Sequence, residues 1–550
     1  MVRMHIKESK AKDFKWLQGK ASRFISQAAE FGYDDVVKLL IEKKIRLEPP
    51  RNPKSNPILL AAQHGHLSVL SYLLSQAHTR TAYCNTSTLR HSLFAAAQGG
   101  HVGIARFLLA CKTYPQKVET PSVNRPLKAF NGRRPLHEAA EANHLEMAKF
   151  LIEAGADVDA TSARGQTALY LATLMGRRQM VQILISAGAD VDIGVSKSPL
   201  MIACKLGWLG VVKSLLESSI AKGNLQSENG DTNTPSPLIR SSNDDVSITR
   251  LESFLEHPIY LASRHGHEPV VKYLLDQIDE ADCRRLGLSF EKSDDRKAIV
   301  DRRHQIWKKR YLRNQGASPW DHLLAASQRG HAGVVELLIS QLGADVNLTN
   351  PDGETPLYLA AGGGHVMTCR MLIENGATVD SNSEEDGETP LCNAARAGSA
   401  PVVKFLLASG ASASVRTRTT GLTPLHFAAR TGSLACVQAL LSHGDEEEGE
   451  GQKKVEVDAK STPEGKTPLF LAAKRGHAVV VSYLAERGAC VNVTTTGGTY
   501  STPLNAASKA GRMDVVSLLL GLGARGNQGK SRRKRDQRRK RNKKETTLTN

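Results

Sequence analysis

A two-part pattern of apolar and polar positions recurs along the chain from about residue 20 to residue 525. In one copy, DGETPLYLAAGGGHVMTCRMLIENGATVD from Asp352, the Thr-Pro step predicts a helix start. A Thr hydroxyl can cap free backbone N–H groups, and Pro fits the first helical turn. The pair Ala360–Ala361 predicts a thin first helix, and Gly364 permits the left-handed turn that ends it. The V-V-x-x-L-L spacing, as at Val335 to Leu338, predicts a second, amphipathic helix.

This helix–turn–helix unit returns at a nearly constant interval. In the last five copies its threonines stand 34, 34, 44 and 35 residues apart, and the long interval contains an acidic insertion that begins at Asp445. Earlier copies diverge more, and the first, at Ile25, is degenerate, which makes about thirteen copies in all. One such unit cannot bury its own apolar face, so the copies are expected to stack into a solenoid. The five threonines are Thr355, Thr389, Thr423, Thr467 and Thr502.

The pattern resembles the ankyrin repeat, whose period is near 33 residues and whose signature is T-P-L-H-x-A. Thr-Pro-Leu-His stands intact from Thr423 to His426. The resemblance implies an all-α ankyrin-repeat solenoid, with stacked helix–turn–helix units joined by β-hairpin loops. It also implies that a partner binds in a concave groove lined by the hairpin tips and the exposed side of each first helix.

Breaks in the repeat give the expected domain organisation. An N-terminal extension at 1–20 precedes repeats at 21–221, a polar loop insert at 222–255 and one repeat at 256–280. A basic, partly helical insert at 281–315 precedes repeats at 316–527, which contain an acidic hairpin insert at 445–463, and a disordered basic tail at 528–550. In the 281–315 insert, Ile299, Ile306 and Tyr311 recur at helical spacing among cations. That apolar stripe would either dock on a partner or pack on the neighbouring repeat.

The basic residues are concentrated in a few segments. The 550-residue chain has a formal net charge of +18. Residues 530–544 hold eleven Lys or Arg and one acid, and residues 284–313 hold eleven Lys or Arg and four acids, so the rest of the chain is almost neutral. Because the positive charge is confined to these segments, it indicates what the segments could bind and says little about the fold.

A second group of cations stands just before the turn glycines. From the fifth full repeat onward, nearly every copy has a Lys or Arg among the two residues that precede this glycine. Stacked repeats would place these side chains about 10 Å apart, in a ladder that selects an acidic peptide or protein surface. The alternative is that solvated helix positions simply favour Lys and Arg. The candidate partner-binding residues are Lys205, Arg264, Arg329, Arg396, Arg430, Lys474, Arg475 and Lys509.

The tail KSRRKRDQRRKRNKK has no apolar residue and is not expected to fold into the array. Its two basic clusters resemble a nuclear localisation signal, which a nuclear import receptor would bind. Non-specific nucleic acid is another target, bound through its phosphates, and a solvated tail that aids solubility is the third interpretation. The residues concerned are Arg532, Arg533, Lys534, Arg535, Arg538, Arg539, Lys540, Arg541, Lys543 and Lys544.

The histidines and cysteines do not form a catalytic or metal-binding pattern. His137–Glu138 has Glu141 where a zinc-binding H-E-x-x-H motif needs its second His. None of the eight cysteines lies within three residues of another, which indicates reduced thiols. We therefore expect no enzyme activity, no cofactor and no metal. The histidines that the resemblance assigns to bracing turns and neighbouring repeats are His66, His101, His137, His267, His331, His365, His426 and His477.

The function expected from these features is a non-catalytic protein–protein interaction scaffold or adaptor with nuclear access. One alternative is an adaptor that recruits substrates to a ubiquitin ligase or another modifying enzyme. A second is an RNA- or chromatin-associated factor tethered by its tail. The N-terminus lacks an apolar signal core and no stretch approaches about 18 apolar residues, so no membrane partner is expected. The expected location is nuclear, cytoplasmic or both.

Overall fold

The computed structural model of the chain describes residues 22–42, 52–110, 121–191, 193, 198–228, 257–286, 300, 321–383, 386–446, 455–496 and 502–525. The chain divides into two compact units, Met1–Arg240 and Ser241–Asn550, which are treated separately below. The expected N-terminal extension, the basic tail, and most of the inserts at 222–255 and 281–315 lie outside the described residues.

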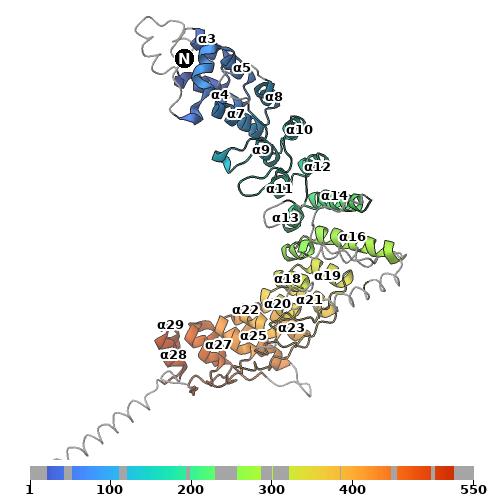
Figure 1. The fold of residues 1–550 in the computed structure, drawn as a ribbon. Helices are drawn as coiled ribbons and strands as arrows, with labels where there is room; N and C mark the ends of the chain where they lie inside the picture. Colours follow the sequence, from blue (N-terminus) through green and yellow to red (C-terminus); the bar gives the residue numbers. More distant parts are fainter. Residues whose placement is uncertain are drawn as a thin grey trace, which may run out of the picture. The chain divides into compact units, whose positions relative to one another are not determined.

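The N-terminal unit is a stack of short helices in which each first helix packs on the first helix of the next repeat (Figure 1). Residues 22–31 are helical and precede α3 (Asp34–Glu42). The elements that follow are η1 (Pro53–Ser55), α4 (Pro57–His64), α5 (Leu67–Ser75), α6 (Ala77–Tyr83), α7 (Thr86–Gly99), α8 (Val102–Ala110), η2 (Lys128–Phe130), α9 (Pro135–Ala142), α10 (Leu145–Glu153), α11 (Ala168–Leu174), α12 (Arg178–Ser186), α13 (Pro199–Leu206) and α14 (Leu209–Glu228).

The C-terminal unit repeats the same arrangement, and its last five first helices each begin with a Thr-Pro step. Residues 257–265 are helical and precede α16 (Glu268–Leu286). The later helices are α18 (Asp321–Arg329), α19 (Ala332–Ser340), α20 (Pro356–Gly363), α21 (Val366–Glu374), α22 (Pro390–Ala397), α23 (Ala400–Ala408), α24 (Pro424–Thr431), α25 (Leu434–Glu446), α26 (Pro468–Arg475), α27 (Ala478–Glu486), α28 (Pro503–Lys509) and α29 (Met513–Gly521).

The Thr-Pro motif starts the first helix in the way its chemistry predicts. At α20, the Thr355 hydroxyl accepts a hydrogen bond from the backbone N–H of Tyr358 at 3.2 Å, and Pro356 occupies the first turn. The helix ends at Gly364, whose φ of 78° lies in the left-handed region. The helix–turn–helix unit predicted from the sequence is therefore confirmed.

The core runs along the stack between the two helices of each repeat. Ala360 and Ala361 of α20 are fully buried, as are Val335 and Leu338 of α19. Because alanine adds little volume, first helices contact their neighbours more closely than second helices do. Neighbouring repeats thus bury the apolar face that a single repeat would expose.

Short polar loops connect consecutive repeats and are bonded to one another. The Asn347 side chain donates to the carbonyl oxygen of Gly376 at 3.0 Å and accepts from the N–H of Thr378 at 2.8 Å. The loop tips also touch, since the N–H of Thr462 donates to the carbonyl oxygen of Thr420 at 2.9 Å. Throughout the described ranges these loops are tight turns, and no β-strand forms. The predicted hairpins are therefore present as turns.

Helix α7 begins at Thr86, where the Asn85 side chain caps it by accepting from the N–H of Thr88 at 2.7 Å. One helix differs from the expected bounds. Helix α14 continues to Glu228, so the polar loop does not begin at residue 222 as predicted. The reason is that α14 lacks a Gly-Ala stop such as Gly155–Ala156, which follows α10.

Candidate protein-binding surface

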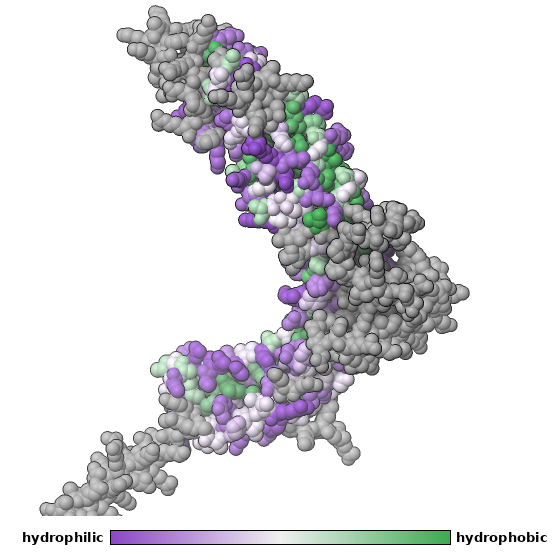
Figure 2. All heavy atoms as spheres, in the orientation of Figure 1, coloured by the Kyte–Doolittle hydropathy of each residue, from purple (hydrophilic) through white to green (hydrophobic). Residues whose placement is uncertain are grey.

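The eight candidate cations lie where the repeat pattern placed them. Each is exposed at the C-terminal end of a first helix. Lys205 belongs to the N-terminal unit. We call the seven in the C-terminal unit the cationic row: Arg264, Arg329, Arg396, Arg430, Lys474, Arg475 and Lys509. Over α22 to α27, hydrophilic side chains surround a smaller apolar area on the visible face (Figure 2).

Histidines fix the backbone beneath this row. His477 Nε2 donates to the carbonyl oxygen of Arg430 in the preceding repeat at 3.1 Å, and His365 Nε2 donates to that of Gln328 at 3.2 Å. His331 makes the same kind of bond to the backbone of Arg264. The bonds to Arg430 and Arg264 hold these two cationic positions to the next repeat through the main chain. They do not involve the side chain of either residue.

Several turn glycines lie directly against a histidine of a neighbouring repeat. A Cβ added to Gly432 would lie 2.4 Å from His477 Nδ1, and one added to Gly330 would lie 2.3 Å from His365 Nδ1. Such distances are well below van der Waals contact, and both glycines also have positive φ. In the N-terminal unit, Trp208 packs over Gly176 in the same way. Other side chains also fill this position, and at Arg396 the hydroxyl of Thr431 donates to the carbonyl oxygen in place of a histidine.

A second set of histidines joins each repeat to the following one. His426 accepts a hydrogen bond at Nδ1 from the N–H of Thr423 at 3.1 Å, so its Nε2 is the donor to the carbonyl oxygen of Lys466 at 3.1 Å. His137 bonds the carbonyl oxygen of Gln166 at 2.9 Å in the same manner. Burial lowers the pKa of His426 to about 4, although the bond to Lys466 opposes the shift. The predicted bracing role is confirmed for these histidines.

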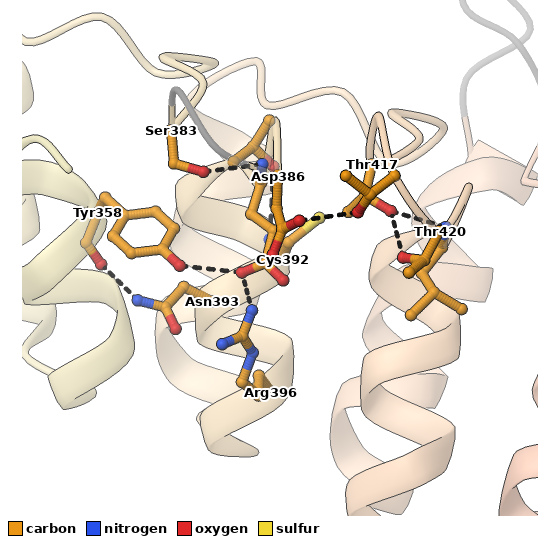
Figure 3. A network of polar contacts seen from close by, with 12 residues as sticks. Tyr358, Ser383, Asp386, Cys392, Asn393, Arg396, Thr417 and Thr420 are labelled. Carbon is orange, nitrogen blue, oxygen red and sulfur yellow. Dashed lines mark hydrogen bonds and ion pairs between the residues drawn. The ribbon is translucent and has the colours of Figure 1, made fainter. Parts of the chain in front are cut away.

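Arg396 differs from Arg430 and Lys474, because it already contacts a carboxylate of its own repeat and an aromatic ring of the next one (Figure 3). Its guanidinium forms an ion pair with Glu388, and it lies over the ring of Phe427 with 5.1 Å between the guanidinium carbon and the ring centroid. The carboxylate of Glu388 is nearly buried and also accepts from the Tyr358 hydroxyl at 2.9 Å. Arg396 is thus partly neutralised within the array.

The N-terminal unit contains the same pair with its charges reversed. Arg133, which lies eight residues before Glu141, forms ion pairs with Glu141 and, at 3.1 Å, with Glu138. Glu388 likewise lies eight residues before Arg396. Burial raises the pKa of Glu138, and the charge of Arg133 opposes this shift. Across a first helix, the residue before the N-cap and the residue eight positions later are therefore partners.

Lys466 and Glu388 are the residues that the sequence interpretation missed. Both stand directly before a Thr-Pro helix start, so comparing that position across the repeats would have identified them. Burial lowers the pKa of Lys466, and the nearby charges of Lys474 and Arg430 lower it further. The charges of a residue in the same repeat and of one in the preceding repeat thus both act on Lys466.

Other chemistry has little support in the described part of the chain. Its residues contain no group of three or more His, Cys, Asp or Glu arranged to hold a metal ion. Cys84, Cys204, Cys369, Cys392 and Cys436 are buried and form no disulfide, and burial raises the pKa of Cys369 to about 12. Within the same ranges, no helix has the length and apolar character needed to cross a membrane.

Comparison with known proteins identifies the repeat. A family described as "Ankyrin repeats (3 copies)" matches residues 25–120, 116–195, 322–417, 380–448, 409–495 and 452–530, which together exceed half of the chain. The chain belongs to the ankyrin repeat family. The ankyrin resemblance stated from the Thr-Pro-Leu-His pattern is thereby confirmed, as is the helical solenoid. Ankyrin repeats are protein-interaction modules, so protein binding is the coarse function of the array.

Two curated relatives share the ankyrin region only. The phosphocholine transferase AnkX of Legionella pneumophila is 27% identical over 147 residues, which are 26% of this chain and 14% of that protein. The ankyrin repeat and KH domain-containing protein mask-1 of Caenorhabditis elegans is 29% identical over 164 residues, which are 26% of this chain and 6% of that protein. The chain thus matches only a small part of the length of either relative.

Proposed function

We propose that this ankyrin array is a non-catalytic scaffold that holds an acidic segment of a partner protein against the first helices of its C-terminal unit. The supporting observation is that α24, α26 and α28 contain Arg430, Lys474, Arg475 and Lys509 and no acidic residue. A surface with one sign of charge attracts a partner of the opposite sign and repels its own.

The histidine bonds support this role because they fix the spacing of the cations. The carbonyl oxygen of Arg430 is held by His477, and that of Lys466 is held by His426. A partner that binds a pre-arranged row loses less conformational entropy than one that must order it. A helix C-terminus also favours a cation through the macrodipole, which explains single members of the row. It does not explain why acids are missing from all three first helices.

A charge-reversal variant tests the proposal. We would replace Arg430, Lys474 and Arg475 with glutamate and compare the proteins captured by the full-length variant and the wild type by quantitative mass spectrometry. The matched control reverses three exposed cations on second helices, namely Lys272, Arg370 and Lys404. Partners with acidic segments should be lost from the first variant only. An unchanged set of partners in the first variant would contradict the proposal.

Nuclear access through the tail is the second part of the proposal. Its support is the sequence of residues 530–544, with eleven cations, one acid and no apolar residue. Deleting residues 530–550 from a tagged protein should shift it from the nucleus to the cytoplasm, and an unchanged distribution would exclude the import signal. A steep fall of RNA binding with salt, abolished by the same deletion, would instead favour the tail as a nucleic-acid tether.

A further inference from the structure

One pair of positions recurs across the first helices with different charges. The residue before the N-cap and the residue eight positions later form an ion pair in two repeats, as Arg133 with Glu141 and as Glu388 with Arg396. The two pairs have opposite polarity. In these two repeats, therefore, the charge at one position is neutralised by the residue at the other.

The repeat of α26 lacks this pairing of opposite charges. The corresponding positions are Lys466 and Lys474, both cationic. Arg430 stands at the position of Lys474 in the preceding repeat, whose first helix α24 packs against α26. Lys466 forms an ion pair with the half-exposed Glu464. Within the ranges that the structure describes, no carboxylate pairs with Lys474 or Arg430. Three cations thus share one acid.

Lys466 is also unfavourable for a second reason. It lies at the N-terminal end of α26, where the helix macrodipole favours an anion. The equivalent positions before α20 and α22 are Glu354 and Glu388, which follow that preference. A cation here opposes both the macrodipole and its neighbours. Departures from local preference of this kind are expected at functional sites.

The backbone prevents these cations from moving apart. The N–H of Lys466 donates to the Ser461 hydroxyl at 2.9 Å, and its carbonyl oxygen accepts from His426 at 3.1 Å. The carbonyl oxygen of Arg430 is fixed by His477 at 3.1 Å. The two repeats are therefore joined by reciprocal bonds on either side of the cations. Only the side chains can respond to the repulsion.

We infer that Arg430, Lys466 and Lys474 form a binding site for a carboxylate from an acidic segment of a partner protein. The incoming carboxylate would neutralise Lys474 as Glu388 neutralises Arg396 in another repeat. This carboxylate site rests on the proposed function and sharpens it, because it places the strongest contact at the boundary between α24 and α26. It also excludes Arg396, whose charge is already neutralised.

The surroundings favour a carboxylate over a nucleic acid. Among the described residues of the C-terminal unit, no Phe, Tyr or Trp side chain is exposed, and Phe427 and Phe470 of α24 and α26 are buried. Single-stranded nucleic acids bind largely by stacking bases on exposed aromatics. The ion pair of Arg396 with Glu388 shows that a cation at the C-terminal end of a first helix can pair with one carboxylate.

Photoaffinity labelling of the full-length protein tests the site. The probe is a glutamate-rich peptide with a central benzophenone, and a peptide with glutamines in place of the glutamates is its control. Labelled positions are mapped by mass spectrometry, so that labelling of the tail is counted separately. We expect glutamate-specific labelling next to Lys466 and Lys474, and a drop of about tenfold in the double variant Lys466→Gln and Lys474→Gln.

Two further variants are matched controls. Arg396→Gln removes one cation that is already paired, and Lys404→Gln removes one from a second helix, so both should keep labelling within about twofold of the wild type. Lys474→Arg retains the charge and should retain the labelling. Equal losses in Arg396→Gln and in the double variant would overturn the carboxylate site.

The result also separates this inference from the proposed function. Labelling of the first helices near Arg264 or Arg329, with none near Lys466, would refute the carboxylate site and leave the acidic-partner scaffold standing. No labelling of the array at all would refute both. Labelling at Lys466 can also be competed with an RNA oligonucleotide or with unlabelled glutamate-rich peptide. If the RNA abolishes labelling at a lower concentration than the peptide does, the site binds phosphates instead.

Discussion

The Nε2 of His477 donates a hydrogen bond to the backbone carbonyl oxygen of Arg430, and the bond of 3.1 Å joins two repeats at the base of the cationic row. His426 makes the opposite connection, from the earlier repeat to the carbonyl oxygen of Lys466. The two bonds run in opposite directions across one boundary. They fix the relative placement of the two repeats more firmly than either bond would alone.

Replacing His477 with alanine should weaken this boundary. The loss of one neutral hydrogen bond lowers the free energy of unfolding by about 1 kcal/mol, and in a stack the effect should stay close to α24–α27. Hydrogen–deuterium exchange should show faster exchange there and an unchanged N-terminal unit. His64→Ala, at an exposed histidine without a described hydrogen bond, is the control. Equal effects of both variants would contradict the bracing role of His477.

Alanine at Gly432 should be worse than alanine at Gly488. Both glycines have positive φ, 84° and 89°, so both variants lose about 1 kcal/mol to backbone strain. Only at Gly432 would the new Cβ meet a side chain, 2.4 Å from His477 Nδ1, whereas nothing lies within 4 Å at Gly488. Urea unfolding should show an extra loss of about 1–3 kcal/mol for Gly432→Ala.

A double variant gives the matching check for Gly432. In a His477→Ala background the steric conflict disappears, so the extra cost of Gly432→Ala should largely vanish. Such non-additivity is expected of residues in direct contact. Strictly additive losses would mean that the imidazole is not the obstacle.

The pKa of His426 predicts how stability depends on pH. The folded-state pKa of about 4 lies below the ordinary value of 6.5, so the unfolded chain binds a proton that the folded chain does not between these pH values. Stability should therefore fall by about 1.4 kcal/mol per pH unit as the pH drops through this window, and this contribution should be constant above it. Urea unfolding from pH 8 to pH 4 measures the slope. His426→Gln should be less stable at pH 7 and should have a flatter profile.

Replacing Glu388 with glutamine should release Arg396. Glutamine can still accept the hydrogen bond from Tyr358 but leaves Arg396 without its counter-charge. We expect a stability loss of about 1–2 kcal/mol together with new labelling near Arg396 by the glutamate-rich peptide. Glu336→Gln removes one charge from the second helix α19 and should change neither property. Unchanged labelling near Arg396 would show that Glu388 does not control this cation.

The sequence predicted the features that depend on local chemistry. The Thr-Pro helix starts, the turn glycines and the bracing role of His137 and His426 follow from groups a few residues apart or from the repeat register. The pairing of Arg396 with Glu388 was not predicted, because two side chains eight residues apart meet only through their length and rotamers. The extension of α14 to Glu228 was not predicted, because no Gly-Ala step in the sequence shows where this helix ends.

The bond between repeats uses the carbonyl oxygen of Arg430, and any amino acid supplies that group. A mutation at this position can therefore change the charge presented to a partner while the stack itself is preserved. Evolution can revise such a surface one repeat at a time, with little risk to folding at each step. Closely related arrays are then expected to diverge first in what they bind and only later in how they are built.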